Sequence, residues 1–177
     1  MKNILFISLI LASCNLSSST KTVYPKKGPS PEVVSVFSPH GCGNIDIRNF
    51  IKEYGHDFSK YQDVDLVEIE EGIYAPEEMW PQETIDTYMR PIFNAYPLPY
   101  DVMIVATRNA PWWGLTRWDF DKSRFEIWMN MDGSYMFGEI FAHEWAHAAT
   151  WDVPESSHGS AWAVLYGGGY RALIGEE

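Results

Sequence analysis

Three residues between positions 143 and 147 have the types and the spacing of a metal-dependent hydrolase site. His143, Glu144 and His147 form the pattern HExxH. On a helix, residues at i and i+4 lie on one face, so both imidazoles can aim a ring nitrogen at one metal ion. Glu144 is turned about 100° from His143, where its carboxylate reaches a metal-activated water rather than the metal. The pattern predicts a Zn2+ site with Glu144 as the catalytic base.

A third histidine offers the ligand that this pattern lacks. Catalytic zinc takes three protein ligands and keeps its fourth position for water. We expect the segment 151–157 to turn the chain, so that a helix opening near Ser157 delivers His158 to the metal. The alternative is a helix with incidental histidines and an exposed loop His158. His40 and His56 lack ligand spacing and are expected at the surface.

The expected chemistry is hydrolysis of a peptide bond by a zinc-activated water, with Glu144 moving the proton to the leaving amine. The oxyanion needs a further donor, and the candidates are Tyr166, Tyr170 and Arg171. Aromatic residues at such spacing also serve core packing. We expect the glycines at 167–169 to end the second helix rather than to bind phosphate.

The elements that must position this site follow from periodicity. Apolar spacing predicts helices over 47–54 and after Pro81, with Pro91 bending or ending the second one. Alternation and buried runs predict strands over 67–69 and 102–106, and a hairpin of 115–120 with 125–130. The zinc helix is expected to start near Ser134. The predicted fold class is α+β, a small zincin-like domain with a short, mostly antiparallel sheet, the HExxH helix and a following helix.

The combination of HExxH with a downstream His158-Gly159 and the aromatic Trp162 resembles the SprT-like (Spartan-type) zinc metallopeptidases. In that family a glycine-led hairpin ends in a hydrophobic, Asn-containing strand before the zinc helix, and the segments 114–117 and 127–130 are similar. The resemblance covers roughly residues 100 to 170. It implies that His143, His147 and His158 are the zinc ligands and that Glu144 is the catalytic residue.

The first residues have the pattern of a bacterial lipoprotein leader. Lys2 precedes an apolar run over 4–11, and Leu-Ala-Ser-Cys ends at Cys14 in the manner of a lipobox. The run is too short to span a bilayer. We expect a signal peptide over 1–13, lipidation of Cys14, a tether over 14–39 and the metallopeptidase domain over 40–177. An ordinary signal peptide with an incidental Cys14 is the alternative.

The second cysteine, Cys42, is expected to be a free or buried thiol. If Cys14 is not acylated, a disulfide between the two cysteines is possible. A single thiol without a CxxC partner is weak evidence for a metal ligand.

Composition limits the partners. The chain of 177 residues is 46% hydrophobic and 15% aromatic, which suffices for one compact domain. Its net charge of -11 argues against nucleic-acid binding. We therefore expect a protein or peptide substrate, and a membrane contact through the lipid at the cell envelope, on its periplasmic or extracellular face. Two alternatives stay open: a peptidoglycan amidase or endopeptidase, and a non-catalytic lipoprotein in which zinc holds a binding surface.

Overall fold

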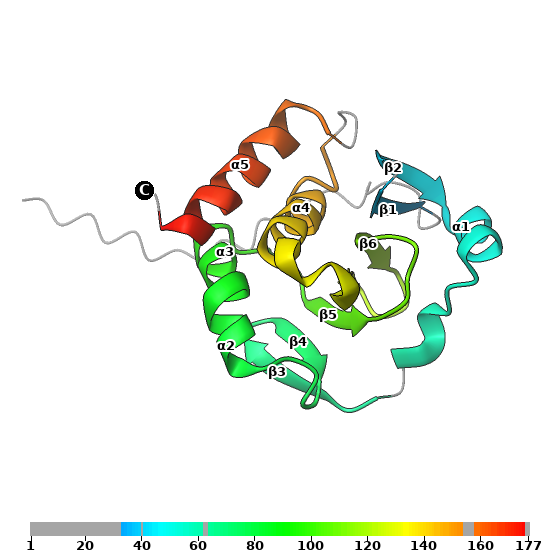
Figure 1. Cartoon of the computed structure of the whole chain (residues 1–177), viewed down its shortest axis with the longest axis horizontal. Coiled ribbons are helices and arrows are strands. Elements are labelled where there is room, and N and C mark those ends of the chain that lie inside the picture. The colour runs from blue at the N-terminus through cyan, green and yellow to red at the C-terminus, as the bar shows by residue number, and fades with distance from the viewer. Residues whose placement is uncertain (1–32, 40, 62–63, 154–157, 176–177) are drawn as a thin grey trace, which may run out of the picture.

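The computed structural model describes residues 33–39, 41–61, 64–153 and 158–175, and Figure 1 shows their arrangement. Seven strands in this part of the chain form one sheet in the order β2-β1-β6-β7-β5-β4-β3. The strands are β1 (Val33–Ser38), β2 (Gly41–Asp46), β3 (Leu66–Glu70), β4 (Ile73–Pro76), β5 (Val102–Thr107), β6 (Gly114–Asp119) and β7 (Arg124–Asn130). The helical elements are α1 (Ile47–Tyr54), η1 (Phe58–Tyr61), α2 (Gln82–Thr84), η2 (Ile85–Met89), α3 (Arg90–Ala95), η3 (Met131–Met136), α4 (Phe137–Ala149) and α5 (Ser160–Ile174).

The sheet is mixed, and most of its pairings are antiparallel. β5 runs parallel to both of its neighbours, β4 and β7. The other pairs are antiparallel, including the predicted hairpin of β6 and β7. The connection from β4 to β5 passes through α2, η2 and α3, because parallel neighbours need a crossover. The α+β class is confirmed, and the sheet is larger than expected because β1, β2 and β4 were not predicted.

Helices cover both faces of the sheet. Along β5, Ile104 packs with residues of α3 and α4 on one face, whereas Met103 and Val105 pack with Phe50 of α1 on the other. Alternate residues of a strand point to opposite faces, so this strand is buried on both sides. In the sheet β5 lies between β7 and β4, and α4 lies against the sheet beside α5 (Figure 1).

Two predicted helices agree with the structure in position. α1 begins where the Asp46 carboxylate accepts hydrogen bonds from the backbone N–H groups of Arg48 and Asn49. The helical segment after Pro81 does not end at Pro91, because α3 continues to Ala95. A π-helical segment, η2, precedes α3, and Pro91 lies in the first turn of α3, where a missing N–H costs little.

The helix that carries the HExxH pattern starts later than predicted. A 3-10 turn, η3, fills the positions around Ser134, and α4 begins at Phe137. The helix after the turn also starts later, at Ser160, with Gly159 at its N-cap. Ser157 lies outside the described residues.

The expectation that the glycines at 167–169 end this helix is wrong, since α5 continues to Ile174. A Cβ at Gly168 would lie 1.9 Å from the hydroxyl oxygen of Tyr96. Glycine at this position therefore serves close packing of α5 against the end of α3 rather than a helix stop.

The folded part reaches further towards the N-terminus than the predicted boundary. β1 falls within the range 14–39 that we expected to be tether, and it pairs with both β2 and β6. The predicted leader, Cys14 and the rest of the tether lie outside the described residues. Among the helices that are described, none has both the length and the apolar character needed to cross a membrane.

Candidate metal centre

Three histidine side chains converge between α4 and the start of α5. The Nε2 atoms of His143 and His147, which share one face of α4, lie 3.1 Å apart. His158 directly precedes the N-cap of α5, and its Nε2 lies 3.4 Å from that of His143. The rings of His147 and His158 complete the triangle, with centroids 4.8 Å apart. The structure thus brings together the three histidines that the sequence singled out.

The spacing and charge of these imidazoles suit a metal ion. Zn–N bonds of 2.0–2.1 Å in tetrahedral geometry place ligand nitrogens about 3.3 Å apart, and the two measured separations lie on either side of that value. Burial lowers the pKa of His143 to about 3 and the pKa of His147 well below its usual value. It lowers the pKa of His158 as well. Neutral imidazoles are the form that binds a metal.

A cysteine joins this cluster. The ligand atoms of Cys42, His143 and His158 all lie within 4.8 Å of one another, so this group could hold a metal ion. The thiol is free and exposed, and its pKa is raised to about 11 by partial burial and by the nearby Glu144 carboxylate. Local spacing does not point to this placement, because Cys42 has no nearby cysteine and stands between Gly41 and Gly43.

Glu144 is fully buried beside the histidines. The hydroxyl of Thr116 on β6 donates a hydrogen bond of 2.7 Å to its Oε2. Its Oε1 has no hydrogen-bond partner among the described residues. Burial raises the pKa of Glu144 to about 8, against the opposing effect of the Thr116 hydrogen bond. Buried polar atoms are rarely left unpaired, so an orphaned carboxylate oxygen points to a functional role.

A row of residues across the sheet forms the floor beneath α4. Phe37 of β1 pairs in register with Cys42 of β2 on one side and with Gly114 of β6 on the other. Residues directly opposite in a sheet share a face. Phe37 stacks on the His143 ring, with centroids 4.3 Å apart and planes 11° apart. A Cβ at Gly114 would lie 2.8 Å from Oε1 of Glu144, so glycine makes room for the carboxylate.

Aromatic side chains of α5 form the opposite wall. Trp162 contacts the rings of all three histidines, at centroid distances of 4.8 Å to His143, 5.5 Å to His147 and 4.5 Å to His158. Tyr166 stacks on Trp162 at 4.9 Å and lies 5.9 Å from His143. Trp162 therefore lies between α5 and the histidines of α4.

The three candidate oxyanion donors occupy different places. Tyr166 contacts His143, as described above. Tyr170 lies one turn further along α5 and lines a pocket, and Arg171 is exposed. Of the three, Tyr166 is the one that the structure brings to the histidines.

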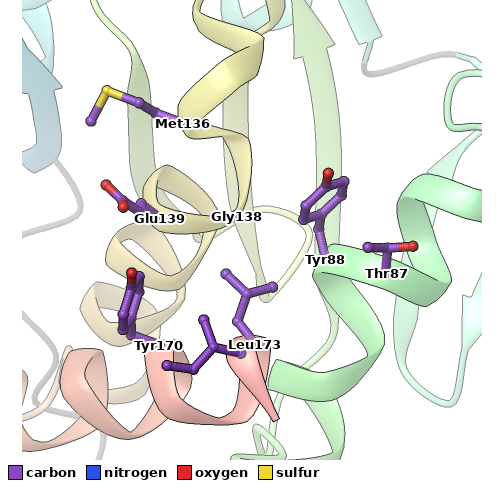
Figure 2. A pocket seen from close by; sticks show the side chains of 8 residues that line it. Thr87, Tyr88, Met136, Gly138, Glu139, Tyr170 and Leu173 are labelled. Carbon is purple, nitrogen blue, oxygen red and sulfur yellow. The ribbon is translucent and has the colours of Figure 1, made fainter.

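The pocket that Tyr170 lines lies between α4, α5 and η2 (Figure 2). Glu139 and Tyr170 lie on one side of it, and Tyr88 and Thr87 on the other. Glu139 stands one helical turn before His143 on α4, and its charge contributes to the raised pKa of Tyr166. The pocket therefore lies beside the first turn of α4, towards the same seam between α4 and α5 that holds the histidines. Its complete lining is Thr87, Tyr88, Met136, Gly138, Glu139, Tyr170, Leu173 and Ile174.

One histidine outside the cluster is not the surface residue that we expected. His56 is half-buried among aromatic rings, with ring centroids 4.5 Å from Phe58 and 4.6 Å from Trp128. Its Nε2 is buried with no hydrogen-bond partner among the described residues, and burial lowers its pKa to about 4. His56 is thus a packing residue, and His40 lies outside the described residues.

The site therefore consists of three converging histidines, a buried glutamate with one unpaired oxygen, and a cysteine from the neighbouring hairpin. Comparison of the chain with protein-family models, with curated proteins and with solved structures finds no match in any of the three.

Proposed function

We propose that this protein is a zinc-dependent metallopeptidase with a zincin-like fold, in which His143, His147 and His158 hold Zn2+ and Glu144 is the catalytic base. The observation that carries the proposal is the meeting of the three imidazoles beside a fully buried carboxylate whose Oε1 is unpaired. A site that only stabilises a fold has no use for such a carboxylate, whereas hydrolysis needs a base next to the metal.

The residues around the metal have separate roles in the proposed hydrolysis. Zinc, when bound, supplies a Lewis acid that polarises a carbonyl and lowers the pKa of water. Glu144 accepts a proton from the attacking water at Oε1 and passes it to the nitrogen of the leaving amine. Thr116 holds Oε2 by its 2.7 Å hydrogen bond and so keeps the other oxygen available. A base works best when its pKa lies near the working pH, and burial moves the pKa of Glu144 in that direction.

Tyr166 is our proposed donor to the developing oxyanion. Its ring lies 5.9 Å from His143 and is held by stacking on Trp162. A phenol donates a hydrogen bond as long as it stays protonated, and the raised pKa of Tyr166 keeps it so. Tyr166→Phe removes the donor and keeps the stacked ring, so it separates this role from packing.

The test begins with the metal. Full-length protein is purified as wild type, as His158→Ala and as His56→Gln, a control histidine outside the cluster, and zinc is measured by mass spectrometry. We expect about one zinc per chain in the wild type and the control, and little or none in His158→Ala. Absence of zinc from the wild type after reconstitution would overturn the proposal.

The second step asks which bond is cut. Zinc-loaded wild type and Glu144→Gln are compared on an unfolded protein and on purified peptidoglycan. Cleavage of the protein that is lost in Glu144→Gln supports the peptidase. Cleavage of peptidoglycan alone would replace it by an amidase or endopeptidase of the envelope. Zinc without cleavage of either would leave a non-catalytic binding protein.

We also propose that the domain is tethered to the cell envelope by a lipid on Cys14, at the periplasmic or extracellular face. The support is the apolar run over 4–11 followed by Leu-Ala-Ser-Cys. Cys14→Ser should move the protein from the membrane fraction to the soluble fraction, with Cys42→Ser as the matched control. Retention of Cys14→Ser in the membrane would contradict the anchor.

A further inference from the structure

We propose that the Cys42 thiolate is a fourth protein ligand, so that the hairpin of β1 and β2 closes the metal position that the peptidase reaction leaves to water. The inference rests on the proposed function, since it assigns a resting state to that same site. In this resting state Cys42 occupies the fourth coordination position, and it must leave the metal before water can bind there.

The sheet carries Cys42 to the metal side. Cys42 pairs in register with Phe37, and residues directly opposite across two strands point to the same face. Phe37 stacks on His143 at 4.3 Å, which fixes that face as the one beneath the histidines. The thiol therefore reaches the cluster by the geometry of the hairpin.

The distances fit coordination by a thiolate. Sγ of Cys42 and the nearest ring nitrogens of His143 and His158 all lie within 4.8 Å of one another. A tetrahedral zinc with a Zn–S bond of 2.3 Å places sulfur about 3.6 Å from each nitrogen. For His143 and His158 the gap to be closed is therefore at most about 1.2 Å, which a modest rotation about χ1 of Cys42 can supply.

Two features indicate a gate rather than a permanent structural site. The fully buried Glu144 keeps an unpaired Oε1 beside the cluster, and a permanent four-ligand site would leave that carboxylate without a task. Moreover, among the strands that the structure describes, β2 lies at the edge of the sheet and pairs with β1 alone, whereas α4 is buried along its length. The thiol thus sits on an element that can separate from the metal while His143 and His147 stay in place.

The test uses cobalt in place of zinc, because Co2+ bound by a thiolate shows a charge-transfer band in the near ultraviolet. The full chain carries Cys14→Ser, which leaves Cys42 as the single thiol, since the sequence has two cysteines. We expect this band in the Cys14→Ser protein and its absence after a further Cys42→Ser change, while the visible bands of bound Co2+ remain. Loss of the thiolate should weaken Co2+ binding by at least about 10-fold.

A second readout is chemical. Alkylation of Cys42 by iodoacetamide should be at least about 10-fold slower with Zn2+ than after chelation, because a coordinated thiolate is shielded. Zinc-loaded Cys42→Ala should cleave faster than the parent, since the fourth position is then open. Binding of Co2+ without the charge-transfer band, together with equally fast alkylation of Cys42 with and without Zn2+, would overturn coordination by Cys42. That result would not contradict the proposed peptidase. Failure to bind Co2+ or Zn2+ would overturn the proposed function itself.

Discussion

Gly114→Ala tests how closely the sheet fits Glu144, the proposed catalytic base. The added Cβ would lie 2.8 Å from both Cγ and Oε1 of Glu144, and 2.9 Å from Cγ2 of Ile140. Carbon atoms rest about 3.5 to 4.0 Å apart, so the carboxylate must move by roughly 0.7 to 1.2 Å. A misplacement of about 1 Å in a reacting group costs roughly 100-fold in rate. We expect kcat of the zinc-loaded variant to fall by about that factor while the bound zinc stays unchanged.

The assay is peptide hydrolysis at saturating zinc, with metal content and thermal unfolding measured on the same samples. Gly167→Ala is the control, because a Cβ there meets nothing within 4 Å. It should keep full activity and gain a little stability, as alanine replaces glycine in a helix. Full activity in Gly114→Ala would refute the reasoning, and so would a loss of activity that follows loss of zinc.

Three further predictions concern the hydrogen bond from Thr116 to Glu144, the half-buried His56 and the metal. Thr116→Val removes the hydroxyl that donates to Glu144, and a hydrogen bond to a charged acceptor contributes about 1.5 to 3 kcal/mol. We therefore expect kcat to fall roughly 10- to 150-fold in Thr116→Val. Thr116→Ser keeps the hydroxyl and should stay near wild type. The pKa of His56 is about 4 in the fold against 6.5 ordinarily, so the unfolded state binds more protons between these values and stability falls as pH drops from 6.5 to 4. In urea titrations the free energy of unfolding of His56→Gln should not show this loss, which amounts to about 1 to 2 kcal/mol after allowance for the partial exposure of His56. Chelation should lower the Tm of the wild type by roughly 8 to 16 °C, as expected for loss of about 4 kcal/mol of ligand stabilisation, and should hardly change that of His158→Ala.

The central part of the site could be predicted from local sequence because its geometry is local. His143 and His147 lie on one helix face, and i, i+4 spacing alone decides that. The strands β5, β6 and β7 follow the apolar pattern of buried strands, so they too were predictable. His158 needed one more assumption, that the chain after α4 brings this residue back to the helix, and the structure places its Nε2 3.4 Å from that of His143.

The β1–β2 hairpin could not be predicted because its stability comes from distant pairing. Val34 and Val36 belong to the core, but prolines and serines precede them, and this composition favours a tether. β2 has the sequence Gly-Cys-Gly-Asn-Ile-Asp, which has little strand propensity of its own. β1 pairs with β6, which lies far along the chain. The same distance hid the proposed role of Cys42, since a metal ligand from another strand leaves no local spacing to recognise.

The glycine run in α5 makes this helix the weakest part of the site. Three consecutive glycines cost about 2 to 3 kcal/mol of helix stability relative to alanine, so α5 depends on its packing against α3 and α4. His158 precedes its first turn, and the ring of Trp162 in that turn contacts His143 and His147 of α4. Metal release should therefore register first as faster amide hydrogen exchange in α5, while α4 and the central strands stay protected. The bound metal would then hold α5 against α4 through His158, and without the metal α5 would open before the rest of the domain unfolds.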